Sequence, residues 1–179
     1  MARLKNEYLY AKNTFYHIYN RGNNKELIFF DTRDYLRFVG VLFRYEELYD
    51  LSLYAYCLMP NHYHLLLRLG SSEKSISQYM HRCMTAYVMY FNKKHKHIGR
   101  LFQSPFQARR IYTVNGILHV IQYIERNPVK AGLVKVSLDY RWLYISLKQQ
   151  KRDFETRKRD LWAIKARPCA QVPSKPNSV

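Results

Sequence analysis

The pattern of hydrophobic and polar positions divides most of the chain into short strands and longer helices. Thr14 to Tyr19 is rich in strand-forming residues and runs into the turn-forming segment 20–24. Asp31 begins a capping sequence, after which apolar residues recur at helical spacing to about Tyr49. These features predict a strand, a polar loop and a first helix.

The next segments predict a hairpin followed by a second helix. The apolar runs Leu51 to Leu58 and His62 to Leu69 are separated by Met59-Pro60-Asn61, which is typical of two paired strands joined by a turn. From Ser75 an apolar and aromatic stripe recurs at helical spacing, including Tyr79, Tyr87 and Tyr90. We expect this helix to stop near the polar segment 92–97, which resembles a solvated basic loop.

The last predicted elements are a strand over 107–113 and a third helix from Val114 to about Arg126. Asn127-Pro128 should end this helix, because proline disfavours helical backbone at the residue before it. The order βαββαβα predicts an α+β fold, an antiparallel sheet with helices packed on one face. We assign residues 1–150 to one domain and 151–179 to a basic, flexible tail.

The charge balance adds a partner to this picture. Lys and Arg number 30 against 13 Asp and Glu, a formal net charge of +17. Nucleic acid is the commonest partner of so basic a domain, although a basic surface can also merely aid solubility. An acidic membrane is the competing polyanion. The sequence has no basic amphipathic helix, lipid anchor or apolar stretch of about 18 residues, so no membrane association is expected.

Cysteine usage and the first residues point to the cytoplasm. The three cysteines form no CxxC pair, and no apolar signal core follows Met1. This pattern favours a reducing compartment and argues against a disulfide framework or a zinc finger.

The first chemical feature is the pair His62 and His64. Residues two apart on a strand point to the same side, so the two imidazoles should project together while Tyr63 points away. Two imidazoles on a rigid element are natural metal ligands, and a third ligand would have to come from elsewhere in the fold. The alternative is two half-buried strand histidines without a metal.

The second feature is Tyr123 followed by Asn127. Four residues apart on a helix, they occupy one face, one turn from each other. A phenol beside an amide oxygen that binds a metal would place an oxygen nucleophile close to that metal. The alternatives are a tyrosine packed against the sheet and an asparagine that only terminates the helix.

Three blocks together resemble a known family. Met59–Leu67, Gly99–Gln103 and Tyr123–Gly132 are similar to motifs of the HUH single-tyrosine transposases, which occur in bacterial insertion sequences. The resemblance is closest to the REP-associated tyrosine transposases and covers roughly Asn13 to Leu133.

This resemblance implies a fold like that of an RNA-recognition motif and a divalent metal, Mg or Mn. It implies His62, His64 and Asn127 as metal ligands and Tyr123 as the catalytic nucleophile. Two imidazoles fit Mn more comfortably than Mg. The implied enzyme is an endonuclease and transposase that cleaves and rejoins single-stranded DNA through a covalent 5′-phosphotyrosine, at hairpin or palindromic repeats.

The resemblance also implies a DNA partner, a bacterial cytoplasmic location at the nucleoid, and a monomer or homodimer. We expect Arg21, Asn23, Asn24 and Lys25 to form a loop that reads bases near the cleavage site. Arg109 and Arg110 are candidate phosphate contacts. The alternative for each of these residues is a solvated surface position.

Two other functions are compatible with the same residues. A non-catalytic nucleic-acid-binding module on this fold would bind DNA without forming an adduct. A metal-dependent hydrolase that uses water would cut DNA without becoming attached to it. The joint presence of His62, His64, Tyr123 and Asn127 favours the transposase.

Overall fold

The computed structural model describes residues 11–71 and 76–146. The strands are β1 (Phe15–Arg21), β2 (Leu51–Met59), β3 (His62–Leu69), β4 (Gln107–Ile111) and β5 (Leu143–Ile145). The helices are α1 (Thr32–Glu46), α2 (Ile76–His95) and α3 (Val114–Lys130), with short 3-10 turns at Asn23–Lys25 and Ser137–Asp139. The predicted tail and the domain boundary at residue 150 lie outside the described residues.

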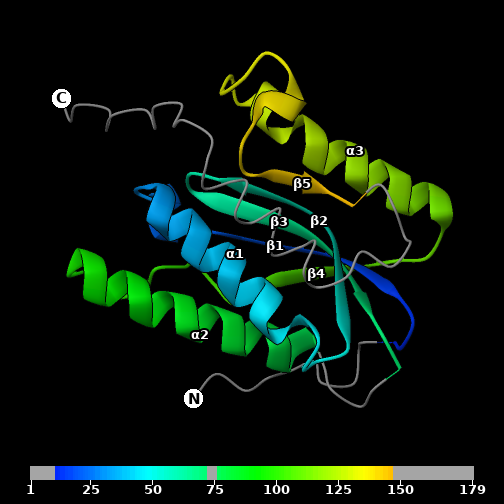
Figure 1. The fold of residues 1–179 in the computed structure, drawn as a ribbon, viewed down its shortest axis with the longest axis horizontal. Coiled ribbons are helices and arrows are strands. Elements are labelled where there is room, and N and C mark those ends of the chain that lie inside the picture. Colours follow the sequence, from blue (N-terminus) through cyan, green and yellow to red (C-terminus); the bar gives the residue numbers. More distant parts are fainter. Residues whose placement is uncertain (1–10, 72–75, 147–179) are drawn as a thin grey trace.

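The five strands of the described chain form one sheet in the order β4-β1-β3-β2-β5, and every neighbouring pair is antiparallel. β1 and β2 are joined through α1 with β3 between them, and β3 and β4 are joined through α2 with β1 between them (Figure 1). This is the split βαβ arrangement of ferredoxin-like folds. The predicted α+β class and antiparallel sheet are confirmed.

Different helices pack on the two faces of the sheet (Figure 1). α1 and α2 pack on one face over a large core that contains Phe38, Tyr63 and Tyr87. α3 packs on the other face through Ile124, whereas the sequence prediction placed the helices on a single face. The physical reason is that the sheet is apolar on both faces, so that each needs a helix to exclude water.

A bulge in β2 creates the apolar patch beneath α3. The register between β2 and β3 shifts between Leu53 and Ala55, which leaves Tyr54 as an extra residue. Leu53 therefore faces the α1–α2 core, whereas Ala55, Cys57 and Met59 face α3. An uninterrupted strand would have put all of these odd-numbered side chains on one face.

α2 ends at His95, inside the segment 92–97 near which the sequence predicted its end, but residues 92–95 are helical and not a solvated loop. Lys94 and His95 lie in its last turn, where both contact the buried carboxylate of Asp34, at 2.8 and 3.0 Å. The Asp31 carboxylate caps α1 by accepting backbone hydrogen bonds, and it also forms an ion pair with Nζ of Lys94, at 2.7 Å. The ion pairs extend α2 because they give its basic end a partner.

α3 also runs past its predicted end. Pro128 lies inside the helix and is buried, and the helix ends at Lys130. A proline near the end of a helix removes only one backbone hydrogen bond, a small loss beside the packing that it makes. As a consequence Asn127 has helical backbone, one full turn after Tyr123.

The other differences concern the edges of the fold. β5 was not predicted; it is three residues long and pairs with β2. Next to it, Trp142 stacks on Tyr35 of α1 with ring centroids 4.3 Å apart. β4 ends at Ile111, and Thr113, which was predicted to be in the strand, caps α3 instead. No helix in the described ranges is long and apolar enough to cross a membrane.

The Asp34 ion pairs give a first prediction. Asp34→Ala would leave Lys94 and His95 without their shared carboxylate and the Phe30 backbone N–H without its 2.8 Å acceptor. Breaking a buried ion pair from one side costs about 3–5 kcal/mol, and we expect a loss of this size in urea unfolding. Asp139→Ala, in the exposed 3-10 turn, should stay within about 0.5 kcal/mol of wild type. Equal losses in both variants would contradict this account.

Candidate active site

His62 and His64 lie side by side on the face of the sheet that α3 covers. Their ring centroids are 5.2 Å apart, and the rings are nearly perpendicular, at 81°. Leu66, two residues further along β3, belongs to the apolar cluster under α3. Tyr63 points into the opposite core and is fully buried. The strand alternation predicted from the sequence is confirmed.

Each of these histidines has its Nδ1 atom engaged by a neighbour. Nδ1 of His64 lies 3.0 Å from Nε2 of His17 on β1. Nδ1 of His62 lies 2.7 Å from Oδ1 of Asn61. These contacts use one nitrogen of each ring.

Burial keeps the histidines in the neutral form, which is the form that binds metals. Burial, and then the charges of His17 and His62, lowers the pKa of His64 to about 3. Burial, and then the charge of Arg109, lowers the pKa of His17 to about 4. Burial and the charge of Arg21 also lower the pKa of His62, and a hydrogen bond with the Asn127 side chain partly opposes this shift.

Tyr123 lies over the histidines. Its ring meets that of His64 edge to face, with centroids 5.1 Å apart, and that of His17 at 5.8 Å. The Tyr123 side chain is nevertheless 43% exposed, so that a large substrate can reach it. The Lys130 ammonium lies 5.9 Å from the centre of the same ring.

Asn127 completes the group. Its amide nitrogen donates a 2.7 Å hydrogen bond to the Tyr123 carbonyl, and its side chain hydrogen-bonds His62. The structure therefore brings together His62, His64, Tyr123 and Asn127, which the sequence singled out. Their chemical roles stay predictions.

His17 is the residue of this face that the sequence did not reveal. It lies on β1 opposite Leu66 of β3, and its side chain points to the same face as the two β3 histidines. A single histidine in a predicted strand gives no signal, because the sequence alone does not say which strands are neighbours. Only the β1–β3 register places His17 against His64.

The side chains present fit a divalent metal. Two neutral imidazoles would supply nitrogen ligands, and Asn127 would supply an amide oxygen, a mixed donor set suited to Mn²⁺. No group of three His, Cys, Asp or Glu side chains within residues 11–71 and 76–146 could hold a metal ion. A third protein ligand would thus have to come from another residue type, and Asn127 stays the predicted one.

The predicted DNA-reading loop lies beside this face. Arg21 is the last residue of β1, opposite His62, and not part of the loop as predicted. Asn23, Asn24 and Lys25 form a 3-10 turn in which the last two have positive φ. The turn is held by the Gly99–Gln103 block through backbone hydrogen bonds from Asn23 to Leu101 and from Gln103 to Arg21.

Arg109 and Arg110 point to opposite faces of β4. Arg109 pairs with His17 across the β1–β4 ladder, and its guanidinium lies 5.8 Å from the ring centre of Tyr19 on the same face. Arg110 pairs with Tyr16 and stacks over the exposed Tyr112 at 5.0 Å. Of the two, Arg109 lies on the histidine face.

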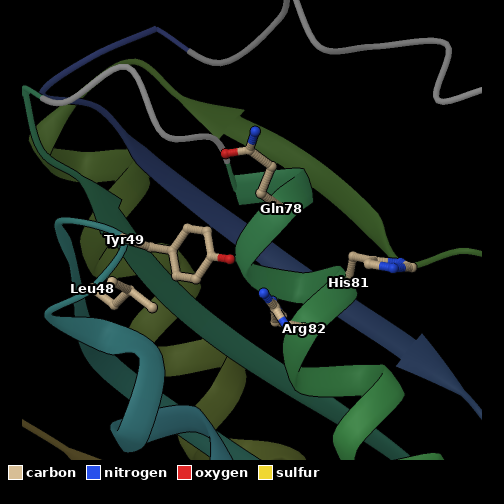
Figure 2. A pocket seen from close by; sticks show the side chains of 5 residues that line it. All are labelled: Leu48, Tyr49, Gln78, His81 and Arg82. Atoms are coloured by element: carbon tan, nitrogen blue, oxygen red, sulfur yellow. The ribbon is translucent and has the colours of Figure 1, made fainter.

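A surface hollow occurs elsewhere, where the residues after α1 meet α2 (Figure 2). It is lined by Leu48, Tyr49, Gln78, His81 and Arg82. Arg82 and Tyr49 point toward one another, whereas His81 points away from them (Figure 2). The hollow shares no residue with the histidine face.

The chain is similar to known proteins in both sequence and fold. The sequence model of the family described as IS200-like transposases matches residues 10–127. The solved structure of a REP-associated tyrosine transposase bound to a REP hairpin has a TM-score of 0.64 and 18% identity, over 95% of this chain and 94% of that chain. A putative transposase from Deinococcus radiodurans gives a TM-score of 0.46 and 19% identity, over 65% and 92%. The comparison with curated proteins found no match.

The fold and the family match together place the chain among proteins of DNA transposition. It belongs to the IS200-like transposase family, because the family match spans well over half of its residues. The resemblance seen in the sequence is confirmed, and with it DNA binding as the coarse function.

The buried histidines give a pH prediction for the metal-free protein. An unfolded histidine has a pKa near 6.5, so between about pH 6.5 and 4 the unfolded chain binds protons that His17 and His64 exclude. The free energy of unfolding should therefore fall on acidification, by up to about 1.4 kcal/mol per pH unit for each ring. The double variant His17→Leu/His64→Leu should show a smaller slope in urea unfolding. An unchanged slope would mean that these rings are not neutral in the fold.

Proposed function

We propose that this protein is a metal-dependent endonuclease that cleaves and rejoins single-stranded DNA, with Tyr123 as its nucleophile. The observation that carries the proposal is the position of Tyr123, over His64 and one helical turn from Asn127, on an exposed part of α3. A tyrosine needed only for packing would be buried, as Tyr63 and Tyr87 are.

Each residue of the site would bind either the metal or the scissile phosphate. His62 and His64, through their Nε2 atoms, and Asn127, through its side-chain oxygen, would hold Mn²⁺ or Mg²⁺. A bound divalent ion supplies Lewis-acid polarisation of the scissile phosphate and stabilises charge on the departing oxygen. The Arg109 guanidinium lies 5.8 Å from the centre of the Tyr19 ring and the Lys130 ammonium lies 5.9 Å from that of Tyr123, and both would hold the phosphate by charge.

The bond changes balance without an external energy source. The Tyr123 oxygen forms a bond to phosphorus and loses its proton to solvent. The bond from phosphorus to the 3′-oxygen breaks, and this oxygen takes up a proton to become a 3′-hydroxyl. The DNA stays attached through a 5′-phosphotyrosine, and attack by a 3′-hydroxyl reverses the step and joins strands.

The proposed substrate is single-stranded DNA next to a hairpin or palindromic repeat. The formal charge of +17 supports binding to phosphates, and the turn Asn23–Lys25 beside Arg21 offers polar groups to unpaired bases. The similar structure of a REP-associated transposase bound to a REP hairpin supports the choice of a hairpin. We propose that the protein acts as a monomer or homodimer in a bacterial cytoplasm.

The nucleophile is tested by trapping the adduct. Wild-type protein, Mn²⁺ and labelled single-stranded DNA that carries a hairpin should give a protein–DNA band that survives denaturation. Tyr123→Phe should lower the adduct on the order of 10³-fold or more, because no oxygen remains to attack. Tyr112→Phe, which changes an exposed tyrosine that is 79% accessible, should leave it unchanged.

The outcomes of this experiment separate the three functions. Adduct at wild-type level in Tyr123→Phe would show that the nucleophile is assigned wrongly. Tight DNA binding without any adduct or cut would favour the non-catalytic module. Cut DNA without attached protein would favour the water-using hydrolase.

The two β4 arginines should separate chemistry from general binding. Arg109→Ala should slow single-turnover cleavage at saturating DNA about 10²-fold, because Arg109 is on the histidine face. Arg110→Ala should leave that rate unchanged and lower the salt dependence of binding by about 0.7 in log–log slope, the loss of one phosphate contact on a single strand. The same effect in both variants would contradict their placement.

A further inference from the structure

His17 and His64 form a buried pair of imidazoles that the fold itself does not require. Their side chains are only 9% and 7% exposed, and the ring nitrogens lie 3.0 Å apart. Burying two polar rings costs free energy unless each hydrogen bond is made, and two apolar residues would fill the same space more cheaply. The position of this pair beside Tyr123 makes a functional role worth testing.

The hydrogen bond links the proton positions of the two neutral rings, because one ring nitrogen must donate and the other must accept. If His64 binds a metal through Nε2, its proton must be on Nδ1, and Nδ1–H then donates to Nε2 of His17. His17 in turn must carry its own proton on Nδ1.

The neighbouring ligand shows the same arrangement. Nδ1 of His62 faces the Asn61 side-chain oxygen, which can only accept, so the His62 proton is also on Nδ1. By this reasoning Nε2 is the nitrogen of each ring that does not carry the proton. The Asn61 amide nitrogen is itself held, by the Lys25 carbonyl at 3.1 Å.

From this geometry we propose that His17 is a positioning residue for the metal site: it accepts the Nδ1–H of His64 and so presents Nε2 of His64 to the metal. This inference rests on the proposed function, in which His64 is a ligand. His17 is not itself the third ligand, because its Nε2 is occupied by His64. The ring of Tyr19, 5.1 Å from that of His17, and the ring of Tyr123 hold His17 in place.

A hydrogen-bond partner of this kind typically changes metal affinity 10–100-fold. The test is Mn²⁺ affinity of the DNA-free full chain, measured from the signal of free Mn²⁺ in electron paramagnetic resonance. His17→Phe keeps a ring of similar shape but cannot accept a hydrogen bond. Its dissociation constant should rise about 10–100-fold.

Two further variants distinguish the hydrogen bond from packing. Glutamine can place an oxygen where Nε2 of His17 lies, whereas asparagine is too short. His17→Gln should therefore stay within about threefold of wild type, and His17→Asn should weaken binding as much as His17→Phe does. If His17→Phe does not fold, the comparison of Mn²⁺ affinity between His17→Gln and His17→Asn still tests the hydrogen bond. His81→Phe, an exposed histidine on α2, is the matched control and should bind Mn²⁺ like wild type.

The outcomes distinguish this inference from the proposed function. Unchanged affinity in His17→Phe or His17→Asn, or equal weakening by Gln and Asn, would overturn the role of His17 and leave the nuclease proposal standing. Wild-type protein that binds no Mn²⁺, or binds it equally well as His64→Ala, would overturn both. Adduct formation by Tyr123 in the wild-type protein is a separate measurement, so a failed His17 prediction leaves that result untouched.

Discussion

The site depends on the contact between α3 and the second face of the sheet. Ile124 is fully buried against a small patch made by Ala55, Cys57, Met59 and Leu66. Alanine and cysteine are short, so the helix approaches the strands closely, and Tyr123 reaches the imidazole of His64. The β2 bulge turns this patch toward α3, and a helix on the other face would carry Tyr123 away from the histidines.

The same contact sets the electrostatics of the site. Because α3 packs over the histidines, water is excluded from them. This burial lowers the pKa of His17 and of His64 and keeps both rings neutral. Positive charge is placed at the edge of the site instead, on Arg109 and Lys130. Neutral imidazole nitrogens with two cationic side chains nearby would suit a metal and a phosphate together.

Local features were predictable from the sequence, and relations between distant segments were not. Strand alternation predicted that His62 and His64 share a face, and helical spacing predicted that Tyr123 and Asn127 do. The side of the sheet on which α3 packs depends on the bulge at Tyr54, which leaves no clear mark in the sequence. His17 depends on the β1–β3 register, and the ends of α2 and α3 depend on tertiary contacts that outweigh the local preferences of Lys94 and Pro128.

The most direct test of this account is a crystal structure of the protein soaked with Mn²⁺, with anomalous diffraction used to locate the metal. We expect one strong peak bound by Nε2 of His62, Nε2 of His64 and the Asn127 side-chain oxygen, beside the Tyr123 hydroxyl. A peak bound through Nδ1, a peak elsewhere on the molecule, or no peak at saturating Mn²⁺ would contradict it.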